Sequence, residues 1–306
     1  MDRHIRDNKL FTKTPAPLNS IFRIASATKL YTAVLAMKLC ESGLLDLEQT
    51  IDIWYPEIIN SDAITVRMLL NHTSGLPDTF EKFSTLLISG LFANRIWKDE
   101  ELIDRHNEMV YFEPGSEWKY SNANYILLGL IIEKISDLSL EQNFQQHIFE
   151  PLKLEETFYR PNENPTPFLL SGFDRSLMPF PNRHKPDQTS WSSLAVGSGA
   201  ILASAMDMAI FMYALFNGDI LEMHTVSQMM DFLPTKDAGE NWTGYGLGIV
   251  RVNIDGKDYY GHEGLFIGFQ SFMLYSPSGN FAIALAANKS QYQQDQVLSD
   301  LIKVIE

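Results

Sequence analysis

Ser26 and Lys29, two residues three positions apart, have the side chains that acyl transfer needs. Positions three apart lie on one face of an α-helix, so a hydroxyl and an amine at this spacing can meet. The hydroxyl would attack a carbonyl carbon, and a deprotonated amine would take its proton. The alternative is a serine that caps a helix beside a solvated lysine. The motif Ser-x-x-Lys recurs by chance in chains of this length, so the alternative is favoured unless other residues join the pair.

The residues after Lys29 predict the helix that would position this pair. The segment from Leu30 to Cys40 is apolar at nearly every position, and Gly43 is a suitable helix end. A helix that is apolar on all sides is a buried helix. Ser26 is therefore expected at the start of a central helix, where backbone N–H groups point outward and favour negative charge.

Two other short segments carry polar residues that could take part in the same chemistry. Tyr120–Asn122 follows a turn at Pro114–Gly115 and precedes a strongly apolar helix. His262–Gly264 lies in a predicted strand of the C-terminal part. Both segments are short, and each motif alone is a weak signal.

The order of the predicted elements indicates the α+β class. The middle of the chain is mostly helical, whereas the C-terminal part alternates strands and turns, with a hairpin signal at Asp255–Gly256, and closes with a helix. We expect a discontinuous sheet domain of residues 1–50 and 240–306 and a mostly helical inserted domain of residues 51–239. The proline-rich stretch 160–190 predicts a long surface loop.

In their order along the chain, Ser26–Lys29, Tyr120–Asn122 and His262–Gly264 resemble the three motifs of the serine β-lactamase/penicillin-binding protein superfamily. The match is best to its class C-like branch, which includes β-lactamase-type esterases, D-aminopeptidases and D-Ala-D-Ala carboxypeptidases. Flanking segments that also fit are Phe22–Ala25, Leu69–Leu76 and Gly197–Ile201. The resemblance runs from Phe22 to the C-terminus. It implies a β-lactamase/transpeptidase-like fold, an antiparallel sheet flanked by helices with an inserted mostly helical region.

The resemblance also implies a role for each residue of the first two motifs. Ser26 would be the nucleophile that forms an acyl-enzyme. Lys29 and Tyr120 would share the proton transfer, with Tyr120 favoured as the base by the family comparison, although two coupled groups cannot be separated by sequence. Asn122 would position either the substrate acyl chain or Lys29.

The strand motif would complete the site. The oxyanion would be held by the backbone N–H groups of Ser26 and Leu265, and Gly264 would let the strand approach the substrate closely. His262 stands where other branches have lysine, and it would hydrogen-bond Tyr120 or stabilise charge on the leaving group. The alternative is a strand histidine with a structural hydrogen bond.

Glu263 departs from the family pattern, because relatives often have threonine or serine at this position to bind a substrate carboxylate. If Glu263 faces the site, it would repel substrates that carry a free carboxylate. The alternative is that its side chain points to the other face, since strand residues alternate. His72, in the segment Asn71–Leu76, is predicted to be structural, and the remaining histidines show no metal spacing.

Composition limits the possible partners and cofactors. The 306 residues include 24 basic and 38 acidic ones, a formal net charge of −14, which argues against nucleic acid and anionic membranes as partners. The single cysteine, Cys40, allows no internal disulfide. We expect no cofactor, no metal and no membrane span.

The N-terminal stretch is the second departure from the family. Relatives usually carry two strands before the nucleophile helix, and no clear strand pair precedes Ser26 here. Without these two strands an edge of the sheet would be uncovered, and we expect either self-association or low stability as a result. The first residues also lack the apolar core of a signal peptide, so a cytoplasmic location is the default expectation, although relatives are often exported and the compartment stays open.

These observations predict a serine hydrolase that acts through an acyl-enzyme on small esters or amides, as a β-lactamase-type esterase or peptidase. β-Lactamase or D-Ala-D-Ala carboxypeptidase activity is the alternative with the same mechanism. A non-catalytic binding protein that keeps the fold is the alternative of another class.

Overall fold

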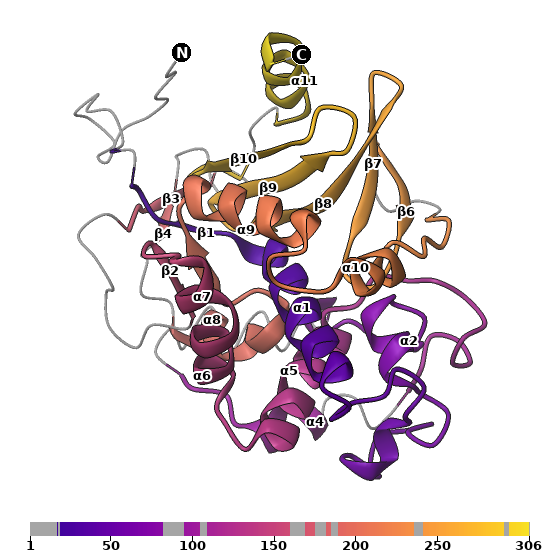
Figure 1. The fold of residues 1–306 in the computed structure, drawn as a ribbon. Helices are drawn as coiled ribbons and strands as arrows, with labels where there is room; N and C mark the ends of the chain where they lie inside the picture. Colours follow the sequence, from indigo (N-terminus) through magenta and orange to yellow (C-terminus); the bar gives the residue numbers. More distant parts are fainter. Residues whose placement is uncertain are drawn as a thin grey trace.

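The computed structural model of the chain describes residues 17, 19–81, 95–104, 109–159, 169–174, 182–184, 189–235, 241–290 and 294–305. They form two regions, a sheet with its covering helices and a mostly helical region, which lie one above the other in Figure 1. α1 (Thr28–Glu41) runs between the two. The α+β class expected from the sequence is confirmed.

The main sheet has five antiparallel strands in the order β10-β9-β8-β7-β6. They are β6 (Trp242–Tyr245), β7 (Val250–Ile254), β8 (Lys257–Phe266), β9 (Phe269–Ser276) and β10 (Phe281–Ala287). The predicted hairpin turn joins β7 to β8, with Asp255 and Gly256 in the left-handed region at φ 50° and 84°. Each strand pairs with its neighbour in sequence, so short turns set the register of β8 against β7 and β9.

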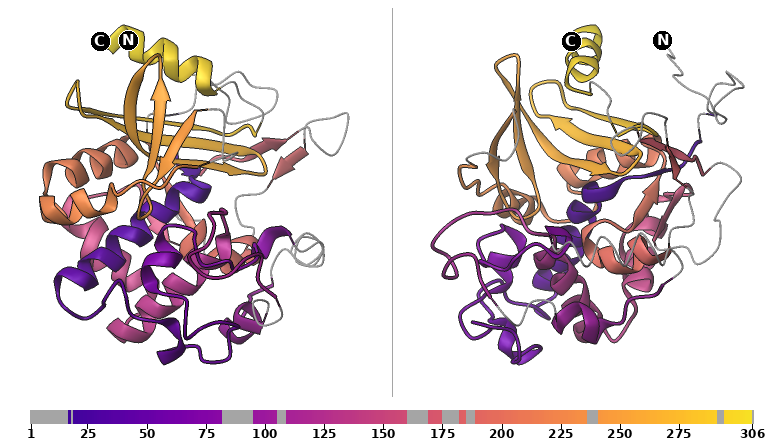
Figure 2. Two further views of the ribbon diagram at one scale, coloured as in Figure 1. Left: turned by 90° about the vertical axis from the view of Figure 1, so that its right-hand side faces the viewer. Right: turned by 180° about the vertical axis from the view of Figure 1, so that it is seen from behind.

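Helices cover both faces of this sheet, as the two views of Figure 2 show. α11 (Gln294–Ile305) lies on one face, where Leu298 packs into the apolar cluster of β7, β8 and β9. α9 (Ala205–Asn217) lies on the other face against β9 and β10, and Phe216 stacks on Tyr275 with ring centroids 4.5 Å apart. By sequence α9 falls within the predicted inserted domain, but by packing it belongs with the sheet.

The helical region is built around α1 and α5, which pack against each other. Every residue of α1 from Thr28 to Met37 is buried, as the apolar sequence predicts. The other α-helices of the described chain are α2 (Val66–Leu70), α4 (Asp99–Ile103), α5 (Asn122–Ser136), α6 (Leu140–Phe144), α7 (Glu150–Leu152), α8 (Thr189–Ala195) and α10 (Met223–Met229). No helix among the described residues is long and apolar enough to cross a bilayer.

Two small sheets complete the described fold. β1 (Phe22–Arg23), β5 (Ile201–Ala203) and β2 (Thr157–Tyr159) form one sheet in this order. This sheet anchors the segment before Ser26, because the Ile24 N–H donates to the Ile201 carbonyl at 3.2 Å. The second sheet is a ribbon of β3 (Gly172–Asp174) and β4 (Asn182–His184), within the stretch that the prolines predicted to be a loop throughout.

Candidate active site

Ser26 lies in a 3₁₀ turn, Ala25–Ala27, that leads directly into α1. Ala25 has a left-handed φ of 49°, which costs free energy for a residue with a Cβ and persists only where the surroundings hold it. One such contact comes from the sheet, where Ser271 Oγ donates to the Ile24 carbonyl at 2.8 Å. The half-buried Ser26 side chain is therefore presented at the start of the central helix.

Lys29 is fully buried one turn further along α1. Its Nζ donates to Ser26 Oγ at 3.2 Å, to Asn122 Oδ1 at 2.7 Å and to the Ser198 carbonyl at 2.8 Å. Burial lowers the pKa of Lys29 from 10.5 to about 7, and the Asp78 carboxylate acts in the opposite direction. Lys29 is therefore far more readily deprotonated near pH 7 than a solvated lysine.

The Asn122 amide is held in one orientation by Asp78. Asn122 Nδ2 donates to both carboxylate oxygens of Asp78, at 2.9 and 3.1 Å. Because the nitrogen of the amide faces Asp78, its oxygen must face Lys29. Asp78 in turn accepts the Phe80 N–H at 2.8 Å, so its carboxylate is fixed by its own loop.

Tyr120 is also close to Ser26, and hydrogen bonding with the Ser26 side chain acts to lower the pKa of its phenol. Lys29 Nζ lies 4.8 Å from the centroid of the Tyr120 ring. Burial raises the pKa of Tyr120 well above its ordinary value, and the hydrogen bond to Ser26 opposes this only in part. Tyr120 is therefore a neutral phenol at rest, whereas Lys29 is the group of the pair that is readily deprotonated near pH 7.

His262 is buried in β8, and both of its ring nitrogens are engaged. Nδ1 lies 2.6 Å from the Glu263 carbonyl, which can only accept, so Nδ1 carries the proton. Nε2 then accepts from the Tyr245 hydroxyl at 3.1 Å. Burial lowers the pKa of His262 to about 3, so the ring is neutral.

These partners differ from the hydrogen bond to Tyr120 that the sequence suggested. The Tyr120 and His262 ring centroids are 6.4 Å apart. The arrangement matches the alternative of a strand histidine with structural hydrogen bonds. An action of His262 on the leaving group stays a prediction.

β8 passes very close to the backbone beside Ser26. A Cβ on Gly264 would lie 2.0 Å from the Ile24 carbonyl oxygen, so only glycine allows this approach. Leu265, the predicted N–H donor, directly follows Gly264 in β8 and is 64% exposed. Alternation in β8 places the half-buried Glu263 side chain on the face opposite to Gly264.

A comparison with known families settles the relationship that these motifs suggested. The family model described as Beta-lactamase matches residues 5–305. The chain belongs to the Beta-lactamase family. The expected membership of the serine β-lactamase/penicillin-binding protein superfamily is thereby confirmed.

Two relatives of this Beta-lactamase family member come from bacteria. Penicillin-binding protein 4* of Bacillus subtilis (strain 168) is 29% identical over 298 residues, which covers 92% of this chain and 64% of the relative. Protein flp of Staphylococcus aureus (strain MW2) is 26% identical over 286 residues, which covers 92% of this chain and 55% of flp. The chain therefore spans less than two thirds of the length of these relatives.

Solved structures confirm the β-lactamase/transpeptidase-like fold. A D-amino acid amidase from Ochrobactrum anthropi SV3, complexed with L-phenylalanine amide, is 26% identical with a TM-score of 0.85. The match covers 97% of this chain and 88% of the amidase. A D-stereospecific amidohydrolase from Streptomyces sp. is 25% identical with a TM-score of 0.84, over 93% of this chain and 87% of the other.

The third partner of Lys29 in this Beta-lactamase family member, the Ser198 carbonyl, has no side-chain signature and was missed by sequence reasoning. It belongs to the turn Val196–Ser198, which follows α8. Val196 has a left-handed φ of 42°, a strained conformation for a β-branched residue. Thr32 of α1 holds the turn by donating to the Gly197 carbonyl at 2.7 Å.

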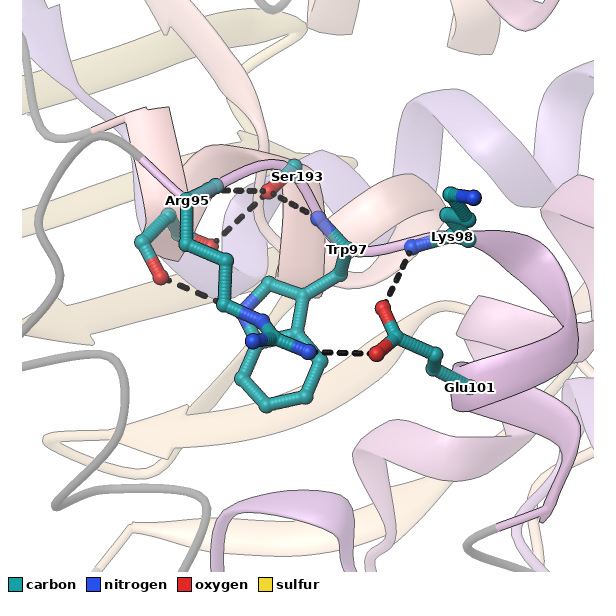
Figure 3. A network of polar contacts seen from close by, with 6 residues as sticks. Arg95, Trp97, Lys98, Glu101 and Ser193 are labelled. Carbon is teal, nitrogen blue, oxygen red and sulfur yellow. Dashed lines mark hydrogen bonds and ion pairs between the residues drawn. The ribbon is translucent and has the colours of Figure 1, made fainter.

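α8 is fastened to the segment before α4 by the polar network of Figure 3. Ser193 Oγ donates to the Arg95 carbonyl at 3.3 Å and accepts the Trp97 N–H at 3.2 Å. Glu101 completes the network by accepting from the Arg95 guanidinium and from the Lys98 N–H. The network thus fixes the helix that delivers the Ser198 carbonyl to Lys29.

Sequence reasoning also missed Asp78, although the turn after Pro77 was a visible signal for a loop. Asp78 is the carboxylate that acts on the pKa of both Lys29 and Tyr120. Among the residues that the structure describes, no group of three or more histidine, cysteine or acidic side chains is arranged to hold a metal ion.

Proposed function

We propose that this chain is a serine hydrolase that forms an acyl-enzyme at Ser26 and acts on small esters or amides. The hydrogen bonds of the Lys29 amine carry this proposal. Asn122 Oδ1 and the Ser198 carbonyl can only accept, so a neutral amine donates its two protons to them. The lone pair of the amine then faces Ser26 Oγ at 3.2 Å. Of the three partners, only the Ser26 hydroxyl has a proton that it can donate.

The acylation step follows from this geometry. The Ser26 hydroxyl proton passes to Lys29 Nζ while Oγ forms a bond to the substrate carbonyl carbon, and the carbonyl electron pair moves to the oxygen. The backbone N–H groups of Ser26 and Leu265 would bind this oxyanion. Loss of one such donor typically costs about 3–4 kcal/mol.

Collapse of the intermediate breaks the bond to the leaving group. The Tyr120 hydroxyl gives the leaving group its proton, which suits a phenol that its raised pKa keeps protonated. The Lys29 ammonium then restores the Tyr120 proton. A water molecule in place of the leaving group repeats the sequence, releases the acid and regenerates Ser26.

We propose neutral or amine-bearing esters and amides as the substrate class. The Asp78 carboxylate acts on the Lys29–Tyr120 pair, and the formal net charge of the chain is −14, so an anionic substrate would approach against repulsion. The D-amino acid amidase among the similar structures, complexed with an amino-acid amide, supports this class. β-Lactamase or D-Ala-D-Ala carboxypeptidase activity is the second candidate, supported by the similarity to penicillin-binding protein 4*.

Covalent labelling tests the proposal. A fluorophosphonate probe should label the chain at Ser26, and Ser26→Ala should lose both the label and turnover of short-chain esters and phenylalanine amide. Ser116→Ala, at an exposed serine, is the matched control and should keep both. An adduct at Ser74 or Ser198 would contradict the assignment, and no adduct at all would favour a binding protein.

We also propose that the chain self-associates through β10. Among the described strands, β10 lies at one edge of the main sheet, and it carries no charged residue, which favours pairing with another strand. Sedimentation velocity over a range of concentrations tests this, and a single monomeric species throughout would refute it.

A further inference from the structure

His72 is a fully buried residue that the mechanism above does not use. It follows α2 with a left-handed φ of 63°, a conformation that costs free energy for a residue other than glycine or asparagine. Asn71 holds this turn, because its Oδ1 accepts both the Thr73 N–H at 3.2 Å and the Thr73 hydroxyl at 2.7 Å. Because its neighbours hold this strained backbone in place, we expect the His72 side chain to have a specific role.

His72 accepts hydrogen bonds from the backbone of both neighbours of Tyr120. The Lys119 N–H donates to the His72 carbonyl at 3.1 Å, and the Ser121 N–H donates to His72 Nδ1 at 3.2 Å. Between these two bonds, the His72 and Tyr120 rings lie with centroids 4.4 Å apart. The backbone before and after Tyr120 and the Tyr120 ring itself are thus all held by one residue.

The protonation of the His72 ring is determined by its partners. Nδ1 accepts a backbone N–H, so it carries a lone pair and the proton of the neutral ring is on Nε2. Asn124 Nδ2 also faces Nδ1 at 3.0 Å, and its orientation is set because Asn124 Oδ1 accepts the Ser74 hydroxyl at 2.5 Å. Among the residues that the structure describes, Nε2 is buried without a hydrogen-bond partner, so hydrogen bonds orient the ring from its Nδ1 side only.

We propose that His72 is the positioning residue of Tyr120, which holds the phenol where it meets Ser26 and the leaving group. This inference rests on the proposed function, since it concerns Tyr120, the group that protonates the leaving group in that mechanism. His72 contacts no reacting atom and acts only through the place that it gives to Tyr120. The acceptor at Nδ1 is the essential feature, because it binds the N–H directly after Tyr120.

Two amide substitutions separate this role from simple stability. His72→Asn places an amide oxygen near the position of Nδ1 and tolerates a positive φ, whereas His72→Gln places its amide near Nε2 and removes the acceptor. His224→Gln, at an exposed histidine, is the control for the same change elsewhere. The two assays are ammonia release from phenylalanine amide and labelling by a fluorophosphonate probe, whose fluoride needs no proton to leave.

We expect His72→Asn to keep kcat for the amide within about fivefold of the parent. His72→Gln should lower this kcat at least 100-fold with KM unchanged, while its rate of fluorophosphonate labelling falls less than tenfold. A role in stability alone would lower both rates together, in proportion to the loss of folded protein. Equal amide kcat values for His72→Asn and His72→Gln would overturn the proposal.

Crystal structures of the two variants give a readout that does not depend on activity. The Tyr120 hydroxyl should stay within hydrogen-bond distance of Ser26 Oγ in His72→Asn and leave it in His72→Gln. An unmoved Tyr120 in His72→Gln would refute the positioning role. If the parent chain neither turns over the amide nor takes the label, the proposed function fails, and the position of Tyr120 in these structures still decides the inference.

Discussion

Removal of the Asp78 charge should move the pH dependence of the enzyme. The carboxylate favours the Lys29 ammonium, so its loss makes the ammonium less stable and lowers the Lys29 pKa below about 7. The Asn122 amide lies between the two groups, and its hydrogen bonds to Lys29 at 2.7 Å and to Asp78 at 2.9 Å put the two charges roughly 7 Å apart. At an effective dielectric constant of about 20 a unit charge at that distance contributes about 2 kcal/mol, and screening at the half-buried Asp78 reduces the shift to about 1 pH unit.

The assay is the pH profile of kcat/KM for a short-chain ester between pH 5 and 9. Activity requires neutral Lys29, so kcat/KM should rise with pH and reach half its plateau near pH 7 in the parent chain. Asp78→Asn should shift this midpoint to about pH 6, so that the variant retains a larger share of its plateau activity at pH 6. The new amide still offers one acceptor oxygen to Asn122, which limits the structural change.

Asp62→Asn is the matched control, because it removes one negative charge from an exposed position remote from the site. Its midpoint should equal that of the parent. A midpoint that stays in place or rises in Asp78→Asn would refute the assignment of Asp78 as the group that tunes Lys29. A parent midpoint above pH 9 would show that Lys29 is not the titrating base.

Four further substitutions test other parts of the site. Lys29→Ala and Tyr120→Phe should each slow acylation by an amide about 1,000-fold, and the double variant should be only slightly slower than either, because the effects of groups that act as a unit are non-additive. Additive losses in rapid-quench measurements would show that the two residues work separately. Gly264→Ala places a Cβ 2.0 Å from the Ile24 carbonyl oxygen and should cost about 1–3 kcal/mol of stability as well as kcat; an unchanged melting temperature would show that β8 has room there. Glu263→Thr should leave the ratio of kcat/KM for an anionic cephalosporin to that for a short-chain ester unchanged, because alternation in β8 directs the Glu263 side chain away from the face on which Gly264 meets the nucleophile turn; a rise of about tenfold in this ratio would show that Glu263 takes part in substrate selection.

Local sequence patterns predicted the elements that hold the nucleophile. The apolar run after Lys29 predicted α1 as a buried helix, because a helix without a polar face can only be a central one. The turn residues Asp255–Gly256 predicted the β7–β8 hairpin, because a positive φ is required there. Each signal is contained within a short stretch of sequence, so it does not depend on the rest of the fold.

The contacts that finish the site depend on distant segments and left no such signal. The Ser198 carbonyl is a backbone group, and any residue at that position could supply it. Asp78 reaches Lys29 only through Asn122, which lies on another element. β5 was missed because its three residues are too short to show an alternating pattern, although they anchor the segment that leads to Ser26.

The hydrogen bond between Ser271 and Ile24 joins residues 247 positions apart. During translation Ser26 and α1 leave the ribosome long before β8 and β9 are synthesised, and α1 has no polar face that would keep it stably folded in water. The nascent chain would therefore carry an intact nucleophile sequence without a working nucleophile. Reactivity should appear in one late step, when the last strands dock, and the closure of so long a loop makes that step slow.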